Sequence, residues 1–541
     1  MKIHAISDGP RESMNTMFFR RKSASFAFHL DWMLARRSTA GRSAMKQVMA
    51  MGTDDFKRVN EMKPLSSQLL FRTKSSRTKM LFRNASFAFL LLLLPKTAPA
   101  QINCGAGSPA PSAGLACLVA VSLTPPSPAG FSPASPLQPR ASGTFSPNTL
   151  AFLSGDIGAE VSQIPLASPA SGIIYANNPT TQLPERLNQS FGPILTQRAQ
   201  TIGRHNWYFA TTYQYFLLKD IDSQALKNTG AVIYLNSSGN PVSSSPDFVG
   251  VSNNNLQLKV HQFVGYMTYG LASRIDVSVA VPLLRVDLRD SVGENFIRDP
   301  SSKSPLVSAP SSISASFAGE ATGVGDVVLA TKVNAWKLRR GDIDHGGFSL
   351  GIEFRLPSGD SHNFLGSGAF GSKPFATFSY AGRFSPHFSI GYQINGKTDL
   401  ISVPSSSTGT VVKGTLPNRL IYSGGADFAL FKKLTINVDG IAQHVFDAQR
   451  ASLVPAGTCL FGSPSPSNSI GCQTSTGTSL ILTPIPVVNP IKASYTQADA
   501  AGGLKLNPFR GFLITGNVSV KLNQAGLRSR VVPLMGASLT F

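Results

Sequence analysis

Two groups of side chains in this sequence stand at spacings that could support catalysis. His387 and Ser389 are two residues apart, so on a β-strand they would share one face, as the base and nucleophile of a hydrolase do. Asp342, Asp344 and His345 could bind a metal ion or act as acid and base. The sequence contains no Ser nucleophile elbow, phosphate-binding loop or zinc signature. We therefore expect no enzymatic activity, no cofactor and no metal site, and we keep a hydrolase only as an alternative.

The residues around the second group have the pattern of a β-hairpin. Apolar and polar residues alternate over 325–337 and again over 347–357, and a polar stretch, 338–346, separates the two segments. A period of two on both sides of a short turn predicts two antiparallel strands. Asp342 and His345 then lie in a solvated turn, which is the better interpretation of both side chains.

Twelve alternating segments follow one another from Gly203 to the C-terminus. The predicted strands cover residues 204–218, 255–270, 274–288, 325–337, 347–357, 373–382, 386–396, 418–431, 433–446, 493–506, 511–522 and 530–541. In the third strand the alternation changes phase at Pro282, and we expect a β-bulge there to restore both faces. His387 and Ser389 lie near the short connection 383–385.

The connections between these strands alternate between long and short along most of the chain. Outer-membrane barrels have this asymmetry, with long extracellular loops and short periplasmic turns. The fold class we predict is all-β: an antiparallel up-and-down transmembrane β-barrel of about 12 strands. Phe541 ends the last strand and is the expected signal for the barrel-assembly machinery, a predicted partner together with outer-membrane lipid.

Net charge does not point to nucleic acid. The chain of 541 residues carries a formal charge of +21, but residues 1–100 hold 18 Lys/Arg against 6 Asp/Glu, and no basic helix or basic-aromatic cluster stands out. We expect no nucleic-acid partner.

The region before the predicted barrel has three parts. Residues 1–79 are basic and aperiodic, and we expect them to be untranslated or disordered; 80–100 have the basic start, apolar core and Ala-x-Ala end of a signal peptide. Residues 101–200 are rich in Pro, Ser and Ala, which favours a flexible periplasmic segment over a plug folded into the barrel, 201–541.

The four cysteines fall into two pairs with a spacing of thirteen residues. Because export brings them to an oxidising compartment, we expect disulfides between Cys104 and Cys117 and between Cys459 and Cys472.

One stretch of the predicted barrel resembles a known family. Residues 323–329, Gly-Val-Gly-Asp-Val-Val-Leu, are followed by Leu-Pro-Ser-Gly-Asp at 356–360 and by Leu-Gly-Ser-Gly at 365–368. This pattern is similar to that of the MetA-pathway phenol degradation proteins, and the resemblance covers roughly 200–541. It implies an outer-membrane barrel that passes small apolar or aromatic compounds, with no catalytic residues.

Charged residues opposite the apolar stripes are expected to face the lumen, because Lys or Arg facing lipid at mid-depth costs about 2–4 kcal/mol. The expected lumen-facing residues are Lys259, His261, Asp276, Arg285, Asp287, Asp326, Lys332, Glu353, Arg355, Asp427, Asp439, Asp499, Lys505 and Lys521. Mixed signs favour cross-strand pairs, and in the hairpin we expect Lys332 to face Glu353. The stripes Leu329 to Val333 and Leu350 to Phe354 then meet lipid.

The function we predict is a passive outer-membrane channel or uptake protein for a small-molecule solute, hydrophobic or aromatic in character. A structural or adhesive barrel that acts through its surface loops is the first alternative, and an outer-membrane hydrolase is the second.

Overall fold

The computed structural model describes residues 114–122, 147–166, 175–177, 184–186, 190–222, 224–235, 248–298, 312–340, 343–404, 411–458, 463–464, 472–473, 483–509 and 511–541. The predicted signal peptide and the segment 1–79 lie outside these residues.

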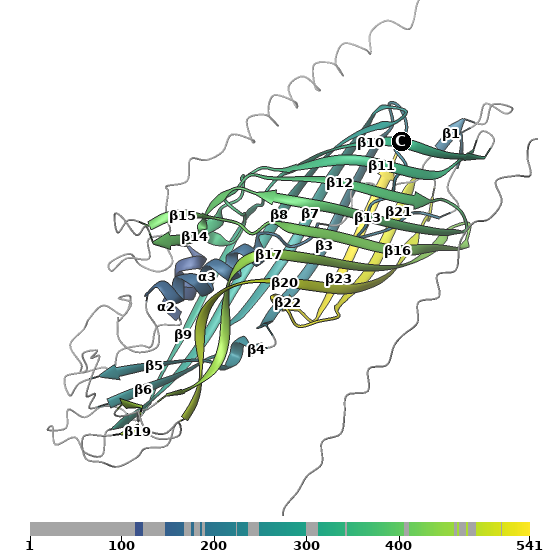
Figure 1. Ribbon diagram of the computed structural model, residues 1–541. Coiled ribbons are helices and arrows are strands. Elements are labelled where there is room, and N and C mark those ends of the chain that lie inside the picture. The colour runs from purple at the N-terminus through teal and green to yellow at the C-terminus, as the bar shows by residue number, and fades with distance from the viewer. Residues whose placement is uncertain are drawn as a thin grey trace, which may run out of the picture. The chain divides into compact units, whose positions relative to one another are not determined.

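Twelve antiparallel strands form a closed barrel (Figure 1), which confirms the predicted fold class and strand number. Around the barrel the order is β3 (Trp207–Ile221), β7 (Gln257–Ala272), β8 (Ile275–Arg298), β10 (Val328–Arg340), β11 (Ile343–Arg355), β12 (Gly371–Tyr380), β13 (Phe384–Asn395), β16 (Arg419–Phe431), β17 (Leu434–Thr458), β20 (Thr483–Leu506), β21 (Phe512–Lys521) and β23 (Val531–Thr540). The first strand, β3, pairs with the last, β23, and closes the ring.

The short connections lie at one end of the barrel, the turn end, together with both ends of the barrel sequence. There Trp207 N donates to the carbonyl oxygen of Phe541 at 2.7 Å, and Phe541 N donates to Trp207 O at 3.0 Å. We call the opposite end the loop end.

The remaining short elements and strand extensions are not among the twelve strands of the ring. They are α2 (Leu115–Ser122), α3 (Pro147–Val161), β1 (Tyr175–Asn177), β2 (Pro184–Arg186), β4 (Gln224–Ala225), η2 (Leu226–Asn228), β5 (Thr229–Leu235), β6 (Phe248–Asn254), β9 (Ser312–Val324), η3 (Ser361–Asn363), β14 (Lys397–Pro404), β15 (Val411–Thr415), β18 (Ser463–Pro464), β19 (Cys472–Gln473) and β22 (Leu527–Ser529). Among the described residues, none of the helices has the length and apolar character that crossing a bilayer requires.

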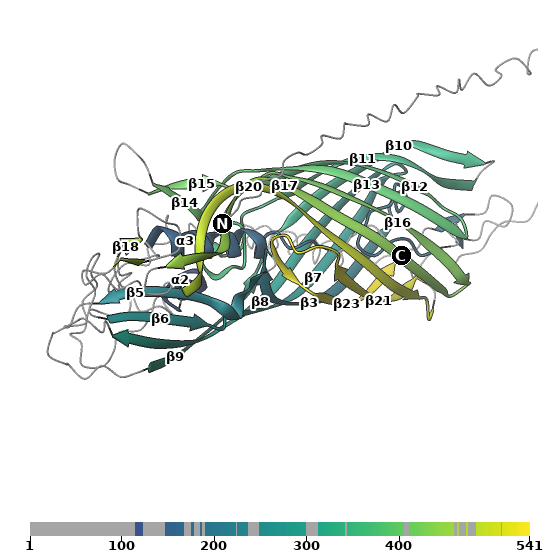
Figure 2. The same ribbon diagram turned by 60° about the horizontal axis from the view of Figure 1, so that its bottom comes forward.

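Several strands are longer than the alternation predicted. Strands β17 and β20 remain paired up to Thr458 and Thr483, although a loop was expected over 447–492. Strand β9 pairs with the far half of β8, where a loop was expected over 289–324. Figure 2 shows these extensions continuing past the loop end, where β5 and β6 join them.

The outward side chains form an apolar belt. Phe263, Leu350 and Phe388, from three different strands, are each between 44% and 50% exposed. Where β3 meets β23, the ring of Phe209 stacks on that of the terminal Phe541, with centroids 5.6 Å apart. An apolar outer band with aromatic residues near its edge is the surface that a barrel presents to lipid.

The apolar belt ends at a definite row of the sheet. Along the register of β3, β7, β8 and β9, we define the boundary row as the outward residues Tyr213, Phe263, Leu283 and Val324. The next two outward rows are Tyr215, His261, Arg285 and Thr322, and then Leu217, Lys259, Asp287 and Glu320. Beyond the boundary row, therefore, the outer face carries charge.

The inner face of the same strands changes in the opposite sense. Val260, Val286 and Leu288 are buried, and they join α2 and α3 in one apolar core at the loop end. From this exchange of faces we infer that the wall leaves the hydrocarbon at the boundary row. On the loop-end side of that row, the outer face meets headgroups or water and the inner face packs on helices.

The same exchange explains the change of phase at Pro282. Strand β8 pairs with β7 in one unbroken register from Arg289 to Asp276, so the predicted bulge at Pro282 is wrong. The interruption lies instead in the neighbouring strand, where residues 325–327 separate β9 from β10.

A segment before β3 fills the barrel near the turn end. Residues 190–202, which we call the plug, are mostly buried. The carbonyl oxygen of Ala199 accepts from Asn334 Nδ2 at 2.9 Å, and Ala199 N donates to Ser379 Oγ at 2.8 Å. The expectation of a loose periplasmic segment is thus wrong for these residues, because inward polar side chains bind the plug's backbone.

Candidate functional site

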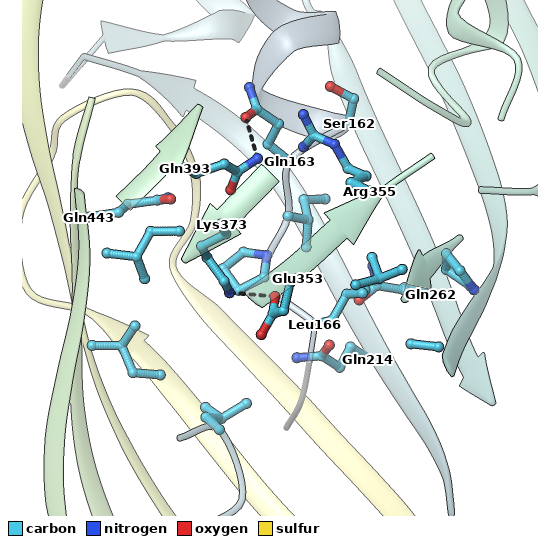
Figure 3. A pocket seen from close by; sticks show the side chains of 18 of the residues that line it. Ser162, Gln163, Leu166, Gln214, Gln262, Glu353, Arg355, Lys373, Gln393 and Gln443 are labelled. Carbon is cyan, nitrogen blue, oxygen red and sulfur yellow. Dashed lines mark hydrogen bonds and ion pairs between the residues drawn. The ribbon is translucent and has the colours of Figure 1, made fainter. Parts of the chain in front are cut away.

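A cavity of about 290 Å³ lies inside the barrel. Residues 160–166, at the end of α3 and just after it, line the side of the cavity that faces the loop end. Plug residues 195–197 line the side that faces the turn end. The wall comes from inward side chains of strands on all sides of the barrel (Figure 3). The cavity therefore occupies the lumen between the loop-end helices and the plug.

The apolar part of the lining comes from large side chains on separate elements. Phe216, Leu284, Phe375 and Ile441 contribute from four strands, and Leu166 from the segment after α3. Such walls favour apolar surface over water.

Neutral amides supply much of the polar lining. Gln214, Gln262, Gln393, Gln443 and Gln497 all line the cavity, and Figure 3 shows four of them around it. Each amide offers both a donor and an acceptor. The sequence interpretation missed these residues because it considered charged positions only, although Gln214 and Gln262 occupy inward positions of β3 and β7.

The charged groups of the lining are partnered inside the protein. Lys373 Nζ lies 2.6 Å from Glu353 Oε2, and Arg355 Nε lies 3.8 Å from Asp326 Oδ2. Asp499 pairs with Arg528, and Glu160 accepts from Gln497 Nε2 at 3.1 Å. Each of these charged groups is thus already bonded inside the protein, and both signs of charge are present in the lining.

Two buried lysines hold the plug through its backbone. Lys332 Nζ donates to the carbonyl oxygens of Arg198 at 3.1 Å and Gln200 at 2.9 Å, and lies 3.7 Å from Asp276 Oδ2. Lys505 Nζ donates to Pro193 O at 2.6 Å. The plug thus depends on charged donors of the barrel wall.

The arrangement of His387 and Ser389 is not that of a base and a nucleophile. His387 Nε2 lies 2.6 Å from Asp439 Oδ1, and its Nδ1 lies 3.8 Å from Asp427 Oδ2. Ser389 Oγ instead shares a hydrogen bond of 3.1 Å with Thr377 Oγ1. Both side chains belong to the hydrogen-bonded barrel wall.

The second candidate group is only partly described. Asp342 and the side chain of Asp344 lie outside the described residues. Within the described ranges, no three His, Cys, Asp or Glu side chains are grouped so that they could hold a metal ion.

The fourteen residues expected in the lumen separate into two sets. The structure places ten on the inner face: Asp276, Asp326, Lys332, Glu353, Arg355, Asp427, Asp439, Asp499, Lys505 and Lys521. It places Lys259, His261, Arg285 and Asp287 on the outer face, contrary to the expectation. These four lie beyond the boundary row, on the side where we infer that the wall has left the hydrocarbon, so their charge does not have to be buried among acyl chains.

The expected pair of Lys332 and Glu353 does not form. Lys332 lies opposite Gly351, and Ala330 lies opposite Glu353. The turn of this hairpin is centred between 341 and 342, so the pairing is displaced from the expected one, and each charge finds its partner on another strand. The stripes from Leu329 to Val333 and from Leu350 to Phe354 do face outward.

Of the four cysteines in the expected disulfides, the structure describes the side chain of Cys117 alone. Cys117, in α2, takes part in a disulfide bond. Cys104, Cys459 and the side chain of Cys472 lie outside the described residues, so both predicted pairings stay predictions.

A cluster of hydrogen bonds joins the strand interruption at 325–327 to the loop 356–370. Asp326 Oδ2 accepts from Ser367 N at 2.8 Å, and Asp326 Oδ1 accepts from Gly359 N at 3.1 Å. Ser358 Oγ accepts from Val327 N at 2.9 Å. These residues carry the family resemblance, and Asp326 and Leu365 of the motif line the cavity.

Replacing Asp326 by Asn should weaken this cluster of hydrogen bonds. An amide keeps one acceptor oxygen but loses the charge facing Arg355, and hydrogen bonds to charged groups contribute about 1.5–3 kcal/mol. We expect the urea midpoint of the folded barrel, measured by heat-modifiable gel mobility, to fall accordingly.

Asp360→Asn is the matched control for that change. Hydrogen bonds with His362 lower the pKa of Asp360 to about 2, but Asp360 is exposed at the N-cap of η3, where Asn caps nearly as well as Asp. A midpoint that falls equally in both variants would contradict the role given to Asp326.

The comparisons agree with the sequence resemblance. Residues 238–422 match the family model described as "Putative MetA-pathway of phenol degradation", which confirms the resemblance for this third of the chain. No curated protein matches the sequence.

Solved barrels are similar at low identity. An outer-membrane channel from Pseudomonas putida F1 is 11% identical, with 63% of this chain and 98% of that one covered and a TM-score of 0.33. The Ralstonia pickettii toluene transporter TbuX is 9% identical, with 63% and 90% covered and a TM-score of 0.27. A Pseudomonas aeruginosa FadL homologue is 9% identical, with 69% and 96% covered and a TM-score of 0.27.

The molecule's own features and the family match together give its location. A closed barrel with an apolar outer belt, and with buried charged side chains on the inner face of its strands, is built for a bilayer. The protein is located in the bacterial outer membrane.

Proposed function

We propose that this outer-membrane barrel takes up small, neutral molecules with an aromatic or otherwise apolar body, and that the lumen cavity is a binding site on their path. The observation that carries this proposal is the cavity itself: its apolar walls, its glutamine amides and its charged groups, which already have partners inside the protein. A neutral ring with a hydroxyl group can bury its ring there and exchange hydrogen bonds with an amide.

The same lining disfavours ionic solutes. An anion or cation would have to lose its water and compete with ion pairs such as Lys373 with Glu353. The family match supports an aromatic solute, because its description concerns phenol degradation and it covers Gln262, Glu353 and Lys373 of the lining.

Binding measured in detergent tests the proposal directly. We expect phenol to bind the purified barrel by isothermal titration, and benzoate and glucose to bind much more weakly. Phenol crosses lipid unaided, so liposome swelling is informative for benzoate and glucose, which should enter slowly.

A pair of variants locates the binding. Gln262→Leu removes one cavity amide and should weaken phenol binding about 2- to 10-fold, the range of one hydrogen bond of about 0.5–1.5 kcal/mol. Gln257→Leu changes an outward residue of the same strand and should leave the affinity unchanged. Equal binding of phenol, benzoate and glucose, or equal effects of the two variants, would refute the proposal.

The strand extensions at the loop end favour one alternative, a barrel that acts by surface contact. Strands β17 and β20 extend well past the predicted strand ends, and β5, β6 and β9 widen the sheet there. If no solute binds the cavity and none enters liposomes, this alternative becomes the better one.

A further inference from the structure

The outer face above the boundary row carries a surplus of basic side chains. Lys219, Lys259, Arg285 and Arg289, which we call the basic patch, lie on the outward faces of β3, β7 and β8. Two acidic residues, Asp287 and Glu320, share this surface. By formal charge the surface is therefore net positive.

Ion pairs use only part of this positive charge. Arg285 Nη2 lies 2.7 Å from Glu320 Oε2, and Arg285 Nε lies 3.3 Å from Asp287 Oδ1. Lys219, Lys259 and Arg289 are in no ion pair with any described residue. As far as the described residues go, these three cations can meet an external partner.

The height of the basic patch on the barrel indicates what that partner is. Below the patch, the boundary row is apolar, with Leu283 47% and Val324 43% exposed, as befits contact with acyl chains. Cross-strand pairing places His261 opposite Arg285, one outward row higher, and Lys259 opposite Asp287, two rows higher. Outward side chains one to three rows above hydrocarbon lie at the depth of lipid headgroups.

Aromatic side chains lie between the apolar belt and the basic patch. Tyr213 Oη lies 2.8 Å from His261 Nδ1, and the ring of Tyr215 lies 4.9 Å from that of His261, centroid to centroid. Rings with a polar atom at one end suit the interface between hydrocarbon and water. They fix the level of the membrane surface on this side of the barrel.

We propose that the basic patch binds the phosphate groups of lipid headgroups in the leaflet at the loop end. Lys259 and Arg289, flanking the paired Arg285, lie on adjacent strands, and neither is in an ion pair with a described residue. The contact holds the barrel at a defined depth and gives this side a preferred lipid. It is independent of what the cavity binds.

Titration of detergent-solubilised protein with lipid A tests the proposal. The probes are bisphosphoryl and monophosphoryl lipid A with the same acyl chains, so only the number of phosphates differs. The wild type should bind the bisphosphoryl form more tightly, and raising the salt from about 0.1 M to about 1 M should weaken that binding.

The double variant Lys259→Gln/Arg289→Gln should lose roughly fivefold in affinity per removed charge, because a basic residue near an anionic headgroup contributes about 1 kcal/mol. The control Lys397→Gln/Lys413→Gln removes two exposed basic side chains of the β14–β15 hairpin and should not change the affinity. Heat-modifiable gel mobility verifies that both variants are closed barrels.

Three results would overturn the proposal. The first is equal binding of the two lipids by the wild type, or binding that does not depend on salt, and this result needs no variant. The second is an equal loss in the control variant, which would indicate net charge alone. The third is displacement of the lipid by an equal concentration of inorganic phosphate, which would assign the patch to free anions.

Discussion

A barrel carrying Lys332→Met and Lys505→Met should conduct ions far better than the wild type. Methionine keeps most of each side chain's volume but removes the ammonium donors that hold the carbonyl oxygens of Arg198, Gln200 and Pro193. Hydrogen bonds to charged groups contribute about 1.5–3 kcal/mol each, so their loss exceeds about 3 kcal/mol and shifts the plug equilibrium towards release by more than a hundredfold.

Single-channel recording in planar bilayers measures this effect, as a larger conductance or long open events. Lys521→Met is the control, since Lys521 is also an inward lysine with a partner, Asp220 at 3.1 Å, and has no hydrogen bond to the plug within the described residues. If the double variant conducts like the wild type while remaining folded, the two lysines do not hold the channel closed.

The second large effect concerns the lipid-facing side of the wall. Leu350 is 50% exposed midway along β11, and Leu350→Arg should reduce barrel assembly, because an arginine facing hydrocarbon costs about 2–4 kcal/mol. Membrane yield and heat-modifiable mobility should both fall.

The same substitution at Thr322 separates lipid contact from strand disruption. Thr322 also faces outward on a strand, but it lies one row above Val324 and hence beyond the boundary row. Thr322→Arg should assemble normally. Normal assembly of Leu350→Arg together with failure of Thr322→Arg would mean that the boundary row has been placed on the wrong side of the hydrocarbon.

The sequence by itself determined the strands and their closure into a barrel. A membrane strand has lipid on one side and polar groups on the other, so alternation is imposed on every strand that crosses, and all twelve could be found. The apolar stripe through Leu350 and the inward placement of Asp427 and Lys505 follow from that period alone.

The tertiary structure alone decided where along a strand the apolar face changes from the outer to the inner one. At Leu283 we place the end of the hydrocarbon on the outer face, and on the inner face helices begin to pack, so the apolar face becomes the inner one while the β7–β8 register continues unbroken. A sequence period records which residues share a face, but not which medium that face meets, and for this reason Lys259, His261, Arg285 and Asp287 were assigned to the wrong side.

The position of the plug also depends on the tertiary structure. Residues 190–202 have no period, and their apolar side chains, such as Ile194 and Ile202, pack against residues of distant strands. Donors and acceptors far along the chain, such as Lys332, Ser379 and Lys505, bind the backbone of the plug. Long-range hydrogen bonds to a backbone leave no local signature, because any residue supplies the same carbonyl oxygen. Only the closed barrel, which brings those side chains around one axis, creates the site that the plug occupies.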